Sequence, residues 1–174
     1  TLEAAMYDSE IPSGVYRNLL EGVRDALPTL YRYYELRRKL MKLDDIHFYD
    51  VYVPILSEIQ VEYSWEAAVE LIGKALAPLG DEYVNTITAG LTSKRWCDRY
   101  ENKNKRSGAF SAACYNGLPY ILMNYKPTVL DSVFTLAHEG GHSMHSWYSI
   151  REQPFRYYDY VTFLAEIAST FNEQ

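Results

Sequence analysis

The sequence predicts a mostly α-helical fold with one small antiparallel sheet, and three observations lead to this expectation. Most of the chain places apolar residues at the three-to-four-residue spacing of an amphipathic helix. Two strand-like runs, "AFSAACY" and "YILMNY", are joined by the turn residues "NGLP" at 116–119. A further helical pattern follows this hairpin, and it holds three of the four histidines of the chain.

The N-terminal part is expected to form two helices that are separated by a proline. Residues 12–26 have a helical pattern capped by Ser13, and a second helix is expected to begin at Pro28 and to end near Leu43. The apolar face of the first helix consists of Val15, Leu19, Leu20 and Val23. Residues 46–63 are mixed, with strand-like composition in "VYVPIL" and "IQVEY", although the proline weakens the first.

The middle of the chain is expected to hold two more helices. Ser64 is a favourable N-cap for "WEAAVELIGKALAPL", and Gly80 is expected to end that helix. Asp81 is expected to cap the next helix, which would run to about Trp96. A polar stretch, "ENKNKRSG" at 101–108, then leads into the hairpin.

The last two helices follow the hairpin. Thr128 and Asp131 have the spacing of a capping box, which predicts a helix from there to about Ser149. "REQP" is expected to form a turn, and residues 158–174 have the pattern of a final helix.

Composition and charge narrow the class of protein. The net charge is −6, from 17 basic and 23 acidic residues, and the basic run "RRKLMK" at 37–42 fits a solvated helix end. We therefore expect no nucleic-acid partner. Cys97 and Cys114 do not form a disulfide framework, and the chain has neither a signal-peptide pattern nor an apolar run of transmembrane length. These features predict a cytoplasmic protein that does not enter the membrane.

The stretch "LAHEGGHSMHSW" at 136–147 contains the pattern H-E-x-x-H on a predicted helix. Residues four apart lie on one face of a helix, so His138 and His142 can reach a single metal ion. Glu139 lies about 100° around the helix from His138, where it can act as a base beside the ion without ligating it. The competing interpretation is a structural helix that matches the motif by chance. Two helical glycines, each costing about 1 kcal/mol relative to alanine, favour a helix that another element or a substrate approaches closely.

A third ligand is expected downstream of the two histidines. The metzincin extension fails, because His145 and Tyr148 stand where that class has glycine and histidine. His145 lies two turns beyond His138, and it is expected to face a groove, to support a ligand or simply to lie at the surface. Among the acidic residues that follow, Glu166 lies inside the apolar run "FLAEIA" between the small residues Ala165 and Ala168. A carboxylate buried there would need a metal or another partner, so Glu166 is the expected third ligand. The alternative is an exposed position on an amphipathic helix.

These segments resemble a known enzyme family. "FTLAHEGGHSMHSWYS" followed by "FLAEIASTFNE" is similar to the oligoendopeptidase F branch of the thimet oligopeptidase-like zinc metallopeptidases. "SGAFS", "PYILMNY" and "HFYDVYVPI" also look like that family, so the resemblance covers most of the chain. Many members have a bulky residue where Gly140 stands, a departure expected to affect packing but not the ligands.

The resemblance implies a set of roles and a domain organisation. It makes His138, His142 and Glu166 the ligands of one Zn²⁺ per chain and Glu139 the catalytic base. It implies a helical zinc-peptidase catalytic region with its small antiparallel sheet beside the H-E-x-x-H helix. Residues 1–174 are then a single internal segment of a larger catalytic domain, with a mainly helical scaffold over 1–100 and the sheet and zinc-binding helices over 101–174. The partners implied are short peptides and the remainder of the same polypeptide, which would supply the groups that stabilise the transition state.

The expected function is a zinc-dependent endopeptidase that hydrolyses internal bonds of short oligopeptides. An alternative is a non-catalytic peptide-binding relative with the same helices, for which a carboxylate at Glu139 would serve no purpose. A zinc deaminase is a third reading, but its Cys-x-x-Cys ligand pair is absent. The hairpin is open to two interpretations: a structural element, or an edge that binds an extended peptide by main-chain hydrogen bonds. Ser169 and Asp159 are further expected to help orient the ligand imidazoles.

Overall fold

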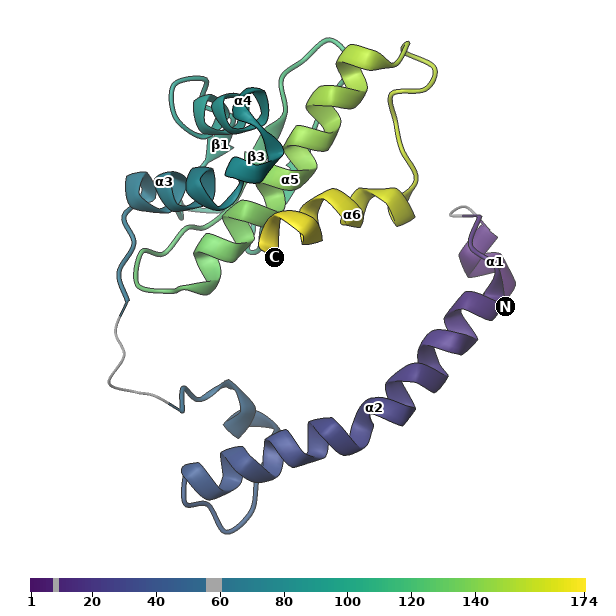
Figure 1. Ribbon diagram of the computed structural model, residues 1–174, viewed down its shortest axis with the longest axis vertical. Coiled ribbons are helices and arrows are strands. Elements are labelled where there is room, and N and C mark those ends of the chain that lie inside the picture. The colour runs from purple at the N-terminus through teal and green to yellow at the C-terminus, as the bar shows by residue number, and fades with distance from the viewer. Residues whose placement is uncertain (8–9, 56–60) are drawn as a thin grey trace. The chain divides into compact units, whose positions relative to one another are not determined.

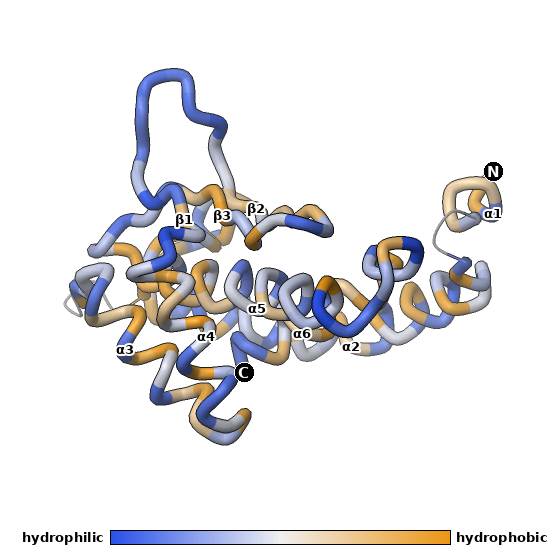
Figure 2. The backbone as a smooth tube through the Cα atoms, turned by 90° about the horizontal axis from the view of Figure 1, so that it is seen from above, coloured by the Kyte–Doolittle hydropathy of each residue, from blue (hydrophilic) through white to orange (hydrophobic). Residues whose placement is uncertain are grey.

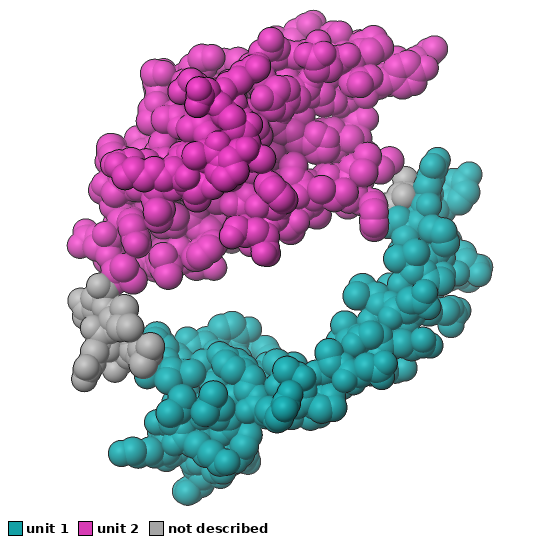
Figure 3. Space-filling view, in the orientation of Figure 1, with its two compact units in different colours: residues 1–60 teal, residues 61–174 magenta. Residues whose placement is uncertain are grey.

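The computed structural model describes residues 1–7, 10–55 and 61–174, and these form two compact units. Unit 1 is residues 1–60 and unit 2 is residues 61–174 (Figure 3). None of the described helices is both long enough and apolar enough to span a bilayer.

Unit 1 consists mainly of one long helix. A short helix α1 (Leu2–Met6) precedes α2 (Ser13–Leu40), which continues through Pro28 without interruption (Figure 1). The expected break at this proline is therefore wrong. Proline has a φ angle that suits a helix. Because it has no N–H group, it removes one helical hydrogen bond, here the one to the Arg24 carbonyl. Arg24 and Pro28 are both exposed, so water can bind the released carbonyl.

A buried arginine fixes the segment that follows α2. Arg37 donates through Nη2 to the carbonyl oxygens of Asp50, at 2.8 Å, and Val53, at 2.5 Å. These bonds hold a 3₁₀ helix, η2 (Phe48–Tyr52), where strand-like composition begins. Residues 53–55 and 61–63 form no strand either, and the rest of the two expected strand segments lies at 56–60, outside the described residues. The apolar face predicted for residues 12–26 is exposed among the residues that the structure describes.

Unit 2 begins with two helices that pack against each other. The Ser64 hydroxyl accepts a hydrogen bond from the Ala67 amide, so the predicted cap of α3 (Trp65–Ala75) is confirmed. A 3₁₀ turn, η3 (Ala77–Leu79), leads to α4 (Asp81–Leu91). This helix ends five residues before the predicted position at Trp96, because the chain folds back there. The Trp96 amide donates to the Gly90 carbonyl at 2.8 Å, and the indole ring lies directly against Gly90.

The sheet is small and mixed. Strand β2 (Phe110–Ala112) pairs antiparallel with β3 (Tyr120–Leu122), which confirms the predicted hairpin. A two-residue strand, β1 (Cys97–Asp98), pairs parallel with β3 on its other side and was not predicted. The order is β1-β3-β2, and the connection between β1 and β2, which carries the polar run at 101–108, is strongly hydrophilic (Figure 2).

The central element of unit 2 is α5 (Asp131–Glu152), which contacts α3, α4, the sheet and α6 (Thr162–Glu173) (Figure 1). The capping box expected at Thr128 is absent. Two successive turns, closed by hydrogen bonds from Val129 to Lys126 and from Ser132 to Val129, lead into the helix instead. The helix also continues past Ser149, so the expected turn at 151–154 begins later, and α6 begins four residues after the predicted start.

The hydrophobic core lies between α3, α4, the sheet and one face of α5. Its largest fully buried side chains are Trp65, Trp96, Ile87, Leu91, Ile121, Met123, Leu136 and Met144. This core fixes α5 from one side and leaves its histidine-bearing turns to contact α6.

A substitution at Gly90 tests the contact that turns the chain from α4 into β1. A Cβ atom there would lie 2.3 Å from Cε3 of Trp96. Overpacking typically costs about 1–3 kcal/mol, whereas alanine gains about 1 kcal/mol of helix propensity over glycine. We therefore expect Gly90→Ala to lower the free energy of unfolding of the full-length protein in urea. In Gly73→Ala the new Cβ would meet Thr88 Oγ1 at an ordinary 3.4 Å, so this control should keep or gain stability. Equal midpoints for the two variants would contradict the contact.

Candidate metal centre

Helix α5 places the two histidines of the motif on one face. His138 and His142 are one turn apart, their ring centroids are 4.8 Å apart, and their Nε2 atoms are separated by 3.1 Å. Both side chains are partly buried. The expectation that these two imidazoles converge is confirmed.

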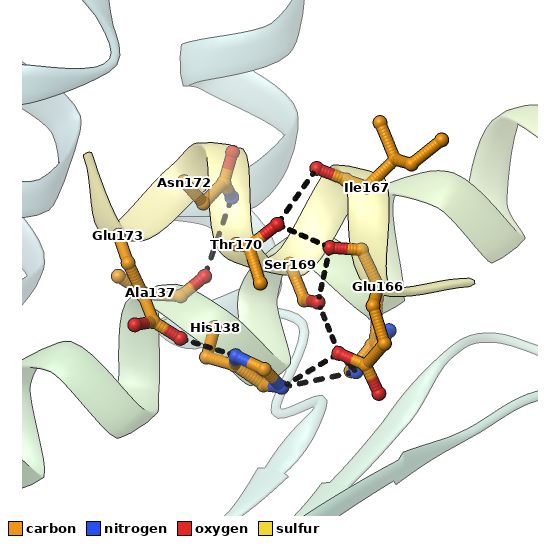
Figure 4. A network of polar contacts seen from close by, with 9 residues as sticks. Ala137, His138, Glu166, Ile167, Ser169, Thr170, Asn172 and Glu173 are labelled. Carbon is orange, nitrogen blue, oxygen red and sulfur yellow. Dashed lines mark hydrogen bonds and ion pairs between the residues drawn. The ribbon is translucent and has the colours of Figure 1, made fainter. Parts of the chain in front are cut away.

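Helix α6 brings Glu166 to the same point. Its Oε2 atom lies 3.4 Å from Nε2 of His138 and 3.6 Å from Nε2 of His142. The three side chains form a group that can ligate a metal, with one donor atom from each. Figure 4 shows Glu166 and His138 of this group. Two zinc ligands at about 2.0–2.1 Å in tetrahedral geometry stand about 3.3 Å apart, and the observed separations match this value.

The burial expected for Glu166 is wrong. Its side chain is 56% exposed among the described residues, even though apolar residues surround it in the sequence. The neighbouring apolar side chains Leu164 and Ile167 are exposed as well. Glu166 is therefore identified by its distance from the two histidines, and the cost of burying a charge contributes nothing to its assignment.

The approach of α6 to α5 depends on Gly141. A Cβ atom at this position would lie 2.6 Å from the carbonyl oxygen of Ala168 and 2.8 Å from the Cα of Ser169. These are backbone atoms, which cannot move aside as a flexible side chain can. The close contact expected from the helical glycines is present. Gly140 faces the other way, and a Cβ there would meet only the side-chain end of Ile87 at 2.9 Å.

Glu139 lies beside the two imidazoles but turns into the protein. The residue is 6% exposed, and its Oε2 atom has no hydrogen-bond partner among the described residues. Burial raises the pKa of this carboxyl group, while the nearby His138 acts against the shift. A higher pKa makes the carboxylate a stronger proton acceptor, which suits a general base.

Burial has the opposite effect on His142. It lowers the pKa of the imidazole, while the Glu166 carboxylate opposes this shift. A lower pKa favours the neutral ring, which is the form that ligates a metal. The first shift makes the Glu139 carboxylate more basic, and the second favours the neutral imidazole at His142 that can ligate a metal.

Further polar contacts come from α6 (Figure 4). Ser169 donates to Oε2 of Glu166 at 2.7 Å, so the expected support from this residue is present and is directed at the carboxylate. Glu173 contacts Nδ1 of His138, and Asn172 donates to the Ala137 carbonyl at 3.3 Å. Neither Glu173 nor Asn172 was predicted from the sequence to support the site. Asp159 does not support a ligand as expected. Among the described residues its carboxylate accepts a hydrogen bond from the neighbouring Tyr160 amide instead.

His145 is not part of the ligand group. Its ring stacks on Tyr160 at a centroid distance of 3.7 Å, and burial lowers its pKa. It also lines an apolar pocket of about 420 Å³ with residues of α4, α5 and α6, among them Tyr83, Leu164 and Phe171. Of the interpretations that the sequence left open, the structure favours a groove-facing histidine.

Comparison with known proteins shows which family the chain belongs to. The chain matches "Peptidase family M3" over residues 1–174. It belongs to peptidase family M3. It is 50% identical over its whole length to an oligoendopeptidase F homolog of Borreliella burgdorferi, and 46% identical over 98% of its length to oligopeptidase PepF of Bacillus subtilis.

The family membership extends to structure but covers only part of each relative. A crystal structure of a protein from Chlamydophila abortus, 48% identical, superposes on 99% of the chain with a TM-score of 0.80. The M3 chain spans 30% of the Borreliella relative, 25% of the Bacillus relative and 28% of the Chlamydophila chain. The family resemblance and the mostly helical fold expected from the sequence are thereby confirmed.

Replacing Gly141 tests whether helix contact sets the site. We expect Gly141→Ala to lower the free energy of unfolding of the metal-free, full-length protein by about 1–3 kcal/mol, because the added methyl group meets backbone atoms. Gly140→Ala is the matched control on the same turn, and it should cost less because the Ile87 side chain can shift. Denaturant titration of both variants measures the difference, and a larger loss for Gly140→Ala would contradict this account.

Proposed function

We propose that this chain carries the metal-binding and proton-transfer groups of a zinc-dependent endopeptidase that hydrolyses internal bonds of short peptides. The observation that supports the proposal most directly is the convergence of His138, His142 and Glu166, with the buried Glu139 beside them. Two imidazole nitrogens and one carboxylate oxygen form a donor set that zinc favours while keeping a fourth position open. Relatives named oligoendopeptidase F and oligopeptidase support peptides as the substrate class.

In this mechanism zinc, when bound, would polarise the scissile carbonyl and lower the pKa of water at the site toward about 7. Glu139 would accept the proton of the attacking water and deliver it to the leaving amine. Its raised pKa makes the Glu139 carboxylate a stronger acceptor of that proton. His138, His142 and Glu166 would hold the ion, and Ser169 donates a hydrogen bond that orients the carboxylate of Glu166.

The rest of the polypeptide has a place in this proposal. Among the described residues, no group is assigned to bind the developing oxyanion. We propose that the remaining part of the enzyme supplies such donors and completes the peptide-binding site. A cytoplasmic location and the organisation as one segment of a larger catalytic domain stay predictions.

The first test of the proposal concerns the metal. The full-length enzyme should bind one zinc ion per chain, and a chelator should abolish peptide cleavage until zinc is restored. His142→Gln should lose stoichiometric zinc, because it removes a donor atom. His145→Gln is the control on the same helix and should keep zinc, since His145 lies outside the ligand group. Metal analysis after dialysis measures both, and unchanged zinc in His142→Gln would refute the site.

The second test separates binding from chemistry. Glu139→Gln should retain zinc but lose about 10²- to 10⁴-fold in kcat, the usual contribution of a general base. Glu152→Gln makes the same substitution at an exposed position of α5 and should leave kcat unchanged. Turnover of an oligopeptide, followed by chromatography, measures both variants. Near-normal kcat in Glu139→Gln would remove Glu139 from the mechanism, whereas zinc and peptide binding without turnover in the unaltered enzyme would favour the alternative of a non-catalytic peptide-binding relative.

A further inference from the structure

One face of α6 contacts the candidate metal centre at three successive turns. Glu166, Ser169 and Glu173 are spaced by three and four residues, so they lie on the same side of the helix. Glu166 reaches the two histidines, and Ser169 donates to Glu166. Glu173 contacts the outer nitrogen of His138 (Figure 4). Helix α6 thus provides the candidate ligand Glu166 and a contact to Nδ1 of the candidate ligand His138.

We propose that Glu173 is a positioning residue that orients His138 for metal binding. The proposal rests on the zinc site of the proposed function and adds to it a residue that neither motif nor family match assigns. Oε1 of Glu173 is in contact with Nδ1 of His138, whereas Nε2 of the same ring faces His142 and Glu166. The two ring nitrogens therefore have separate tasks.

The contact fixes the protonation pattern of the ring. A carboxylate only accepts hydrogen bonds, so Nδ1 of His138 must carry the proton that Glu173 binds. In a neutral imidazole the other nitrogen, Nε2, then presents a lone pair toward the ligand group. The same contact holds the plane of the ring.

The positions of the two residues argue against a plain surface ion pair. Exposed pairs contribute little because both long side chains remain mobile. Here the His138 side chain is 25% exposed and Glu173 is 37% exposed. The neighbouring Asn172 is buried and donates to the Ala137 carbonyl, which fixes the last turn of α6 against the turn of α5 that carries His138. The backbone that carries Glu173 is therefore fixed independently of the contact with His138.

The experiment measures zinc affinity in the full-length enzyme by competition with a chelator. Glu173→Met keeps the length of the side chain and its helix propensity but removes both acceptor oxygens. We expect it to bind zinc about 10- to 100-fold more weakly than the unaltered enzyme, the usual effect of losing an acceptor behind a ligating histidine. Glu173→Gln restores a neutral acceptor and should show an intermediate affinity.

Two controls separate orientation from folding and from charge. The denaturation midpoint of the metal-free Glu173→Met protein should match that of the unaltered enzyme. Asp159→Asn also removes one negative charge from unit 2. Among the described residues the Asp159 carboxylate accepts a hydrogen bond from the neighbouring Tyr160 amide and is not part of the ligand group, so zinc affinity should stay unchanged. With Co²⁺ in place of zinc, the visible absorption bands should change in Glu173→Met and remain unchanged in Asp159→Asn.

The outcomes distinguish the two levels of the proposal. An unaltered enzyme that binds no zinc would refute the metal site and Glu173 with it. An unaltered enzyme that binds zinc, together with a Glu173→Met variant within twofold of its affinity and with the same Co²⁺ bands, would overturn only the role of Glu173. A loss of the same size in Asp159→Asn would also overturn it, because the effect would then be one of overall charge.

Discussion

The contact between α5 and α6 at Gly141 is the constraint on which the candidate metal centre depends. The backbone of Ala168 and Ser169 occupies the space that a side chain at position 141 would fill. Glu166 lies just before this contact and Glu173 lies one turn beyond it, so both reach across to α5 from a helix held at backbone distance. A larger separation would move both carboxylates away from the histidines together, since one rigid helix carries them.

The sequence predicted the part of the site that depends on local spacing. His138, Glu139 and His142 lie on one helix, and the helical repeat alone places the two imidazoles side by side. Glu166 lies beside the histidines, as the sequence predicted. The reason for that prediction was wrong, however, because its side chain is exposed rather than buried. Glu173 could have been found from its position seven residues after Glu166, on the same face. Its partner is on another helix, however, and only the packing of α6 on α5 determines which group it meets.

The fold shows the same division between local and tertiary determinants. The Ser64 cap and the hairpin at 110–122 follow from local chemistry and were predicted. The break at Pro28 was not observed, because an exposed helix can accept the loss of one hydrogen bond. Strand β1 has two residues, too few to show a periodic pattern, and it forms because Trp96 folds back onto Gly90. Where a distant partner decides the conformation, the local pattern is insufficient.

Three unfavourable features of unit 2 lie on one turn of α5. Glu139 is a buried carboxylate with an unpartnered oxygen, and the next two residues are glycines in the middle of a helix. Each lowers stability, the first through desolvation and the others through backbone entropy. The core on the opposite face of α5 and the hydrogen bond between Ser143 and Ser111 of β2 hold this turn in place despite these costs. Proteins commonly depart from the rules of stability at functional positions. The coincidence of three such departures with the meeting point of His138, His142 and Glu166 is independent physical support for a catalytic role of this turn.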